Sequence, residues 1–209
     1  MKKQFLLLLL STTITVSASA YAKINIIEQP KQPSNNFTIK SNLLYGAIAR
    51  SPNIAFEVGL NRNTTLNLSA GYNWFNLTGR RDDNKKLNHW LIQPELRYFI
   101  EERLNGHYIG VHSLFAHYNI GGHERPMLLG KGSKDYRYFG NAYGGGLSYG
   151  YQLRLSQSFG VEFTAGVGYI RMNYDKYGCK SCANKLTEGE TRNYLGPSKA
   201  GISLIFFIK

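Results

Sequence analysis

The sequence predicts an all-β protein, specifically an eight-stranded antiparallel transmembrane β-barrel, on the strength of three observations. Apolar and polar side chains alternate over most of the chain with a period of two, which is the period of a β-strand. The apolar positions carry more large aromatic side chains than the narrow interior of an eight-stranded barrel can hold, so a water-soluble barrel with these side chains inside is disfavoured. Short and long connections alternate, which is typical of outer-membrane barrels.

Residues 1–22 have the features of an export signal peptide. Lys2 and Lys3 form a basic start, an apolar run begins at Phe5, and small residues at positions 18–22 match cleavage sites. Residues 23–36 are polar, contain Pro30 and Pro33, and are expected to form a flexible periplasmic lead-in. We therefore expect residues 37–209 to form the barrel, in the outer membrane of a Gram-negative bacterium.

Alternation predicts the eight strands in chain order, over residues 37–49, 53–61, 64–77, 88–100, 106–120, 138–155, 159–174 and 193–208. The apolar side chains that set the alternation in the middle of the chain include Ile54, Phe56, Val58, Leu66, Leu68, Ile92, Leu96, Ile109, Val111, Leu147, Val161, Phe163 and Val167. No segment has a clear helical pattern. The connections at 61–64, 101–105 and 156–158 are short, whereas those at 78–87, 121–137 and 175–192 are expected to be long external loops.

The outward face of this predicted barrel carries aromatic side chains in two bands. Aromatic belts at both membrane–water interfaces are typical of outer-membrane barrels. The sequence places Tyr72, Trp74, Trp90 and Tyr169 near the outer rim, and Tyr98, Tyr151 and Phe206 near the inner rim.

The inward face is expected to carry a balanced set of charges. Buried charges need partners of opposite sign. The six side chains are Lys40, Glu57, Glu95, Arg97, Glu162 and Lys199. An ion-paired plug is favoured over a pair of carboxylates that would act in acid–base catalysis.

The chain stops on an amphipathic segment that suits the closing strand of a barrel. Lys199, Gly201, Leu204 and Phe206 fit the pattern polar-x-Gly-x-x-apolar-x-aromatic, which barrel-assembly machinery recognises in a last strand. This machinery is therefore an expected partner.

Cys179 and Cys182 are the only cysteines, and both fall in the last predicted external loop. In an exported protein such a pair favours a disulfide that staples the loop. A metal site would need two further ligands, which the surrounding sequence does not supply convincingly, and haem attachment would need His at position 183, where Ala stands. We expect no metal and no other cofactor.

Histidine and serine are the candidates for nucleophilic catalysis. His112 is directly followed by Ser113, so the two side chains point to opposite faces of a strand, and His117 has no serine at the spacing of a His-x-Ser pair. A serine nucleophile needs a base within hydrogen-bonding reach. The histidines are therefore interpreted as ordinary wall residues, and no catalytic residue is expected.

The basic residues of the predicted loops favour contact with outer-membrane lipid and lipopolysaccharide phosphates over nucleic-acid binding, since the chain is exported and has no nucleic-acid motif. Ordinary solvated charge remains an equal alternative. The loop cations are Arg80, Arg81, Lys85, Lys86, Lys131 and Lys134.

Six segments of the sequence resemble a family of Bacteroides-type outer-membrane proteins known as a domain of unknown function. They are residues 41–45 (SNLLY), 89–98 (HWLIQPELRY), 105–110 (NGHYIG), 148–151 (SYGY), 174–177 (YDKY) and 196–204 (GPSKAGISL). The resemblance covers residues 37–209. It implies a small outer-membrane barrel, often encoded near fimbrial genes, and implies no activity.

The expected function is therefore a non-enzymatic structural or surface-interaction role, in fimbrial biogenesis or anchoring, with fimbrial or other surface proteins as partners. A lipid-A-modifying enzyme and, less favoured, a small porin are the alternatives.

Overall fold

The computed structural model describes residues 36–74, 86–121, 136–178 and 185–208. The predicted signal peptide and lead-in, at 1–22 and 23–36, lie outside the described residues except for Asn36.

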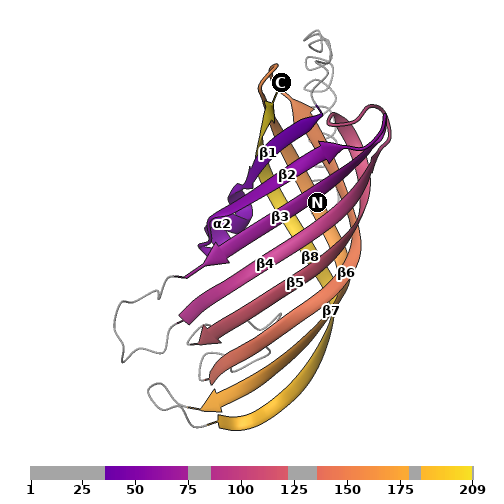
Figure 1. The fold of residues 1–209 in the computed structure, drawn as a ribbon. Coiled ribbons are helices and arrows are strands. Elements are labelled where there is room, and N and C mark those ends of the chain that lie inside the picture. The colour runs from indigo at the N-terminus through magenta and orange to yellow at the C-terminus, as the bar shows by residue number, and fades with distance from the viewer. Residues whose placement is uncertain (1–35, 75–85, 122–135, 179–184, 209) are drawn as a thin grey trace, which may run out of the picture. The chain divides into compact units, whose positions relative to one another are not determined.

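The described residues form one antiparallel sheet of eight strands that closes into a barrel, because β8 pairs with β1 (Figure 1). Each strand otherwise pairs with its neighbours in sequence. The strands are β1 (Phe37–Asn42), β2 (Asn53–Gly59), β3 (Thr64–Asn73), β4 (Lys86–Phe99), β5 (Gly106–Gly121), β6 (Tyr136–Arg154), β7 (Phe159–Gly178) and β8 (Lys185–Ile208). The predicted fold class is confirmed as an all-β, eight-stranded closed sheet.

The first predicted strand is wrong over its second half, because a helix, α2 (Leu43–Ala49), follows β1. Asn42 caps this helix, since its side-chain oxygen accepts a hydrogen bond from the Tyr45 backbone amide at 3.0 Å. Leu and Ala favour helix, and Arg50 ends it in a left-handed conformation with φ of 50°. Residues 43–49 are apolar or glycine at every position, so alternation of polarity could not separate a strand from a helix there.

The last predicted external loop, at 175–192, is wrong in extent. β7 continues to Gly178 and β8 begins at Lys185, so most of that segment is a paired hairpin. The residues of β8 before Lys199 are exposed or half-buried. Polar residues on both faces therefore hid this strand from a search for alternation.

Burial alternates along the strands, which separates an outward from an inward face. Outward aliphatic side chains such as Val111 and Leu147 are more than 60% exposed. Inward side chains such as Glu57 and Gln152 are fully buried. Among the described residues, no helix is long and apolar enough to cross a membrane.

The barrel closes along only part of β8. β1 pairs with β8 from Asn42–Ser203 to Phe37–Ile208, whereas β7 pairs with β8 over nearly its whole length. Within the described residues, positions 185–202 of β8 therefore have a strand partner on one side alone. Helix α2 follows β1 and contacts β8, and its capping residue Asn42 donates a hydrogen bond to the Ala200 carbonyl at 3.1 Å. The helix therefore adjoins the point at which the pairing of β1 with β8 stops (Figure 1).

Candidate functional site

A cluster of six charged side chains occupies the interior of the barrel; we call it the charged network. Its members are Lys40 from β1, Glu57 from β2, Glu95 and Arg97 from β4, Glu162 from β7 and Lys199 from β8. These are the six residues predicted from the sequence, and the side chains of all six are at most 7% exposed. Three cations face three carboxylates, so the cluster has no net formal charge.

Arg97 is the centre of the charged network. Its Nη1 lies 2.8 Å from Glu162 Oε2 and 3.2 Å from Glu57 Oε2. Its Nε donates to Glu95 Oε2 at 2.6 Å. One guanidinium therefore contacts all three carboxylates, which its fixed fork of donors allows.

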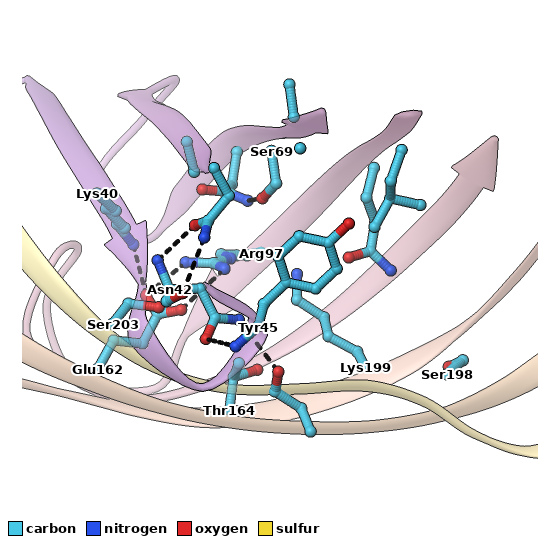
Figure 2. Close-up of a pocket in the computed structure, with 18 residues that line it drawn as sticks. Lys40, Asn42, Tyr45, Ser69, Arg97, Glu162, Thr164, Ser198, Lys199 and Ser203 are labelled. Carbon is cyan, nitrogen blue, oxygen red and sulfur yellow. Dashed lines mark hydrogen bonds and ion pairs between the residues drawn. The ribbon is translucent and has the colours of Figure 1, made fainter. Parts of the chain in front are cut away.

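The two lysines complete the charged network from the closing strands. Lys40 Nζ lies 2.5 Å from Glu162 Oε2 and also pairs with Glu57. Lys199 Nζ lies 2.6 Å from Glu95 Oε2. Lys199 on β8 thus reaches β4 across the barrel, whereas Lys40 on β1 links the nearby strands β2 and β7. Figure 2 shows Lys40, Arg97 and Glu162 of this network.

Neutral side chains satisfy the remaining carboxylate oxygens. Gln152 Nε2 donates to Glu57 at 2.9 Å and to Glu162 at 2.8 Å. The Thr65 hydroxyl donates to Glu57 Oε1 at 2.5 Å, and the Ser148 hydroxyl donates to Glu95. Such bonds matter because buried ions are stable only when their other hydrogen-bonding positions are also filled.

Tyr108 packs against the guanidinium of Arg97, whose Cζ lies 4.5 Å from the ring centroid. The ring needs the space above Gly150, because a Cβ there would lie 2.4 Å from the Tyr108 Cζ atom. The glycines of β6 thus admit large inward side chains from neighbouring strands. Sequence reasoning did not include Tyr108 or Thr65 in the network, although their parity on β5 and β3 places them inward.

A small polar cavity of about 160 Å³ borders the charged network (Figure 2). Its lining residues include Lys40, Arg97, Lys199 and Ser198, together with Tyr45 of α2. Within the described part of the chain, Gln93 Nε2 and Thr164 Oγ1 are buried there without a hydrogen-bond partner. The cavity is therefore large and polar enough for several water molecules, at about 30 Å³ each.

Ser198 and His112 form a contact that sequence reasoning missed. His112 Nε2 lies 2.9 Å from Ser198 Oγ. Ser198 is an extra residue in β8, because Gly166 pairs with Lys199 and Val167 pairs with Pro197. This bulge changes the parity of β8, and Pro197 was the only sequence signal for it. In the described residues, nothing hydrogen-bonds to His112 Nδ1, so the pair lacks the third group that orients the base of a catalytic triad.

An apolar cluster lines the other half of the barrel interior and was also missed; we call it the apolar chamber. Its side chains pack around a cavity of about 310 Å³. The inward-pointing walls include Leu91, Leu114, Ala116, Ala142, Ile170 and Met172. Leu114, Phe115 and Ala116 are consecutive apolar residues, so alternation of polarity could not show that this inward face changes from charged to apolar.

The predicted aromatic bands lie on the outward surface, together with the two apolar residues of the closing-strand pattern, Leu204 and Phe206. Tyr72, Trp74, Trp90, Tyr98 and Tyr169 are each between 39% and 54% exposed, and Tyr151 is half-buried. Leu204 and Phe206 are outward and exposed, whereas Gly201 is buried beside Asn42 and Thr164. Tyr72 pairs in register with Trp90, and Tyr98 lies near the opposite end of β4, so the structure separates these rings along the barrel.

Several predicted residues lie outside the described part of the chain. These are Cys179, Cys182, Arg80, Arg81, Lys85, Lys131 and Lys134. The disulfide and the loop contacts with lipopolysaccharide therefore stay predictions. In the described ranges, no group of three or more His, Cys, Asp or Glu side chains has the arrangement of a metal site.

Comparison with known proteins gives one family. Residues 5–208 match the family described as "Protein of unknown function (DUF3575)". No curated protein and no solved structure was found to match the chain. Since the match spans nearly all of the 209 residues, the chain belongs to the DUF3575 family.

Proposed function

We propose that this chain is a non-enzymatic β-barrel of the outer membrane of a Gram-negative bacterium, with a structural or surface-interaction role. The observation that carries the proposal is the reversed polarity of the barrel, which has charges inside and apolar side chains outside. The closure of the sheet by β1 and β8 also supports it, since paired strands satisfy the backbone groups that hydrocarbon cannot.

The outward surface supports a membrane location. Large apolar side chains from β2 to β8 are exposed there, including Phe56, Leu68, Leu96, Val111 and Leu147. Soluble monomers rarely expose apolar patches larger than a few hundred Å². A lipid environment would cover this surface, and the aromatic residues at 72, 74, 90 and 98 would lie at the lipid–water boundaries.

The charged network supports a closed lumen rather than a pore. Arg97 reaches across the interior to Glu57, Glu95 and Glu162. A water-filled channel needs a wider barrel, because side chains fill the interior of an eight-stranded one. We therefore propose that the barrel passes no sizeable solute and that its partners bind at its ends.

Fimbrial or other surface proteins are the partners we propose, together with lipopolysaccharide and the barrel-assembly machinery. The fimbrial part of this proposal rests on the resemblance described above. Crosslinking in intact cells, followed by purification of the tagged barrel from the outer membrane, tests it. Recovery of fimbrial subunits supports fimbrial anchoring, whereas recovery of other surface proteins alone contradicts it.

Membrane fractionation tests the membrane proposal itself. We expect the full chain in the outer-membrane fraction, migrating faster on gels before boiling than after it, because a closed sheet resists detergent at room temperature. Recovery in the soluble periplasmic fraction would contradict the proposal.

A lipid-A-modifying enzyme is the second candidate, and the contact between His112 and Ser198 favours it. A serine hydroxyl beside a histidine is the arrangement of an activated nucleophile. Mass spectrometry of lipid A, with and without the protein and with the Ser198→Ala variant, separates the two functions. A loss of one acyl chain that depends on Ser198 would replace the non-enzymatic proposal.

A further inference from the structure

The apolar chamber has the size and composition of a site for one narrow apolar ligand. Its volume of about 310 Å³ lies at the lower end of the roughly 300–1,000 Å³ of ligand pockets. An eight-stranded barrel can hold a single small ligand in its interior. Taking a methylene to occupy about the 30 Å³ of a water molecule, the chamber holds a chain of roughly ten carbons.

One polar group in this apolar surrounding points to a polar atom on the ligand. Tyr118 lines the chamber and is 6% exposed. Among the described residues, nothing hydrogen-bonds to its hydroxyl group. A buried hydroxyl without a partner is costly, and a ligand oxygen that accepted its hydrogen bond would remove that cost.

Two further polar side chains, His89 and Tyr45, lie at the same level of the chamber as Tyr118. His89 pairs in register with Tyr118 on the neighbouring strand, and its Nε2 lies 2.8 Å from the hydroxyl oxygen of Tyr45 in α2. On the charged-network side, the next inward residues are Leu91 and Ala116, which pair in register, followed by Leu114 on β5, so the wall is apolar there. The chamber thus matches an amphiphile, with a polar head near Tyr118 and a tail toward Leu91 and Leu114.

Helix α2 is the part of the chamber lining that does not belong to the sheet. Tyr45, Ile48 and Ala49 line the chamber, yet no residue of α2 is buried. The helix lies beside the part of β8 that β1 does not reach. An acyl chain can therefore enter at α2 without breaking the ladder of paired strands.

We propose that the apolar chamber binds one unbranched acyl chain of about ten carbons, whose carboxylate or ester oxygen accepts a hydrogen bond from the Tyr118 hydroxyl. The inference rests on the interior of the barrel alone, so it holds whether or not the proposed surface-interaction role is correct.

The test uses the full chain in phosphatidylcholine nanodiscs, because detergent tails would compete for the site. A diazirine-bearing decanoate is photo-crosslinked to the protein, and saturated fatty acids of 6 to 16 carbons compete with it. Each methylene buried should tighten competition about fourfold, with a plateau near ten carbons. Peptide mapping should place the label on inward residues of β4 to β7.

Three variants locate the site. Ala116→Phe and Ala142→Phe fill the chamber and should weaken labelling more than tenfold. Ala165→Phe adds the same ring to the outward surface, since Ala165 is exposed, and should leave labelling of the interior unchanged. Tyr118→Phe keeps the shape of the wall and should weaken competition by fatty acids about tenfold through the lost hydrogen bond.

The source of the chain is resolved by a second competitor, lysophosphatidylcholine. Competition by it as strong as by the free acid indicates a lipid-borne chain, and competition by the free acid alone indicates a free fatty acid. Label confined to outward residues, equal labelling of folded Ala116→Phe, or no chain-length plateau would overturn the proposal. If the filling variants fail to fold, the chain-length series and Tyr118→Phe decide it.

Discussion

Replacing Arg97 by alanine should lower the free energy of unfolding by about 3–5 kcal/mol, the cost of removing one partner from a buried ion pair. The structure favours the upper part of that range. Arg97 contacts all three buried carboxylates of the charged network, at 2.6 Å from Glu95, 2.8 Å from Glu162 and 3.2 Å from Glu57. After the substitution, two lysines face three carboxylates, so one negative charge stays buried without compensation.

Urea unfolding in lipid vesicles, followed by tryptophan fluorescence, measures this change. Arg62→Ala is the matched control, because Arg62 is exposed in the turn between β2 and β3 and its loss should cost no more than about 0.5 kcal/mol. Adding Glu162→Gln to Arg97→Ala removes one negative charge and should restore part of the stability. A loss below about 1 kcal/mol for Arg97→Ala, or no recovery in the double variant, would refute the account of the charged network.

Three further experiments test the wall and the loop. Phe206→Asp should lower the yield of heat-modifiable protein, because a carboxylate in lipid costs about 3 kcal/mol at mid-membrane and less near the rim; an unchanged yield would contradict the outward assignment. Gly144→Ala should lower the free energy of unfolding in urea by about 1–3 kcal/mol, since its Cβ would lie 2.1 Å from a backbone oxygen of β7. Gly46→Ala is the control: the nearest atom to its Cβ would be 3.5 Å away, and the change should be neutral or slightly stabilising. Equal effects of the two substitutions would count against this packing. Replacing Cys179 and Cys182 together by Ser should leave the barrel folded but speed protease cleavage of their loop, and two free thiols in the native protein would exclude the disulfide.

Alternation predicted most of the barrel because, outside the apolar chamber, polar side chains lie on the inward face and apolar ones on the outward face. Ile54, Phe56 and Val58 are exposed or half-exposed on the outside, whereas Glu57 between them is fully buried. The odd or even positions of the charged residues along their strands also place the six members of the charged network on one face, and the structure brings all six into contact. Pairwise distances and the central position of Arg97 depend on the stagger of the strands, which no local pattern contains.

The sequence analysis missed features in segments where neighbouring residues do not differ in polarity. Residues 43–49 are apolar or glycine at odd and even positions alike, so they show no alternation. The helix-capping residue Asn42 is the sequence feature that indicates α2. The apolar chamber was missed for the same reason at Leu114 and Ala116. The contact between Ser198 and His112 requires a bulge at Pro197, which shifts the parity of a strand by one residue.

Depth-dependent quenching of the native tryptophans tests the central claim most directly, namely that the apolar outward wall lies in lipid. The chain has two tryptophans, Trp74 and Trp90, which are outward and 54% and 39% exposed. In vesicles of brominated phosphatidylcholine, the account predicts that lipids brominated near the head group quench both residues strongly, and that lipids brominated near the chain end quench them less, since aromatic belts lie at the interface. No quenching by any brominated lipid, with emission typical of water, would contradict it.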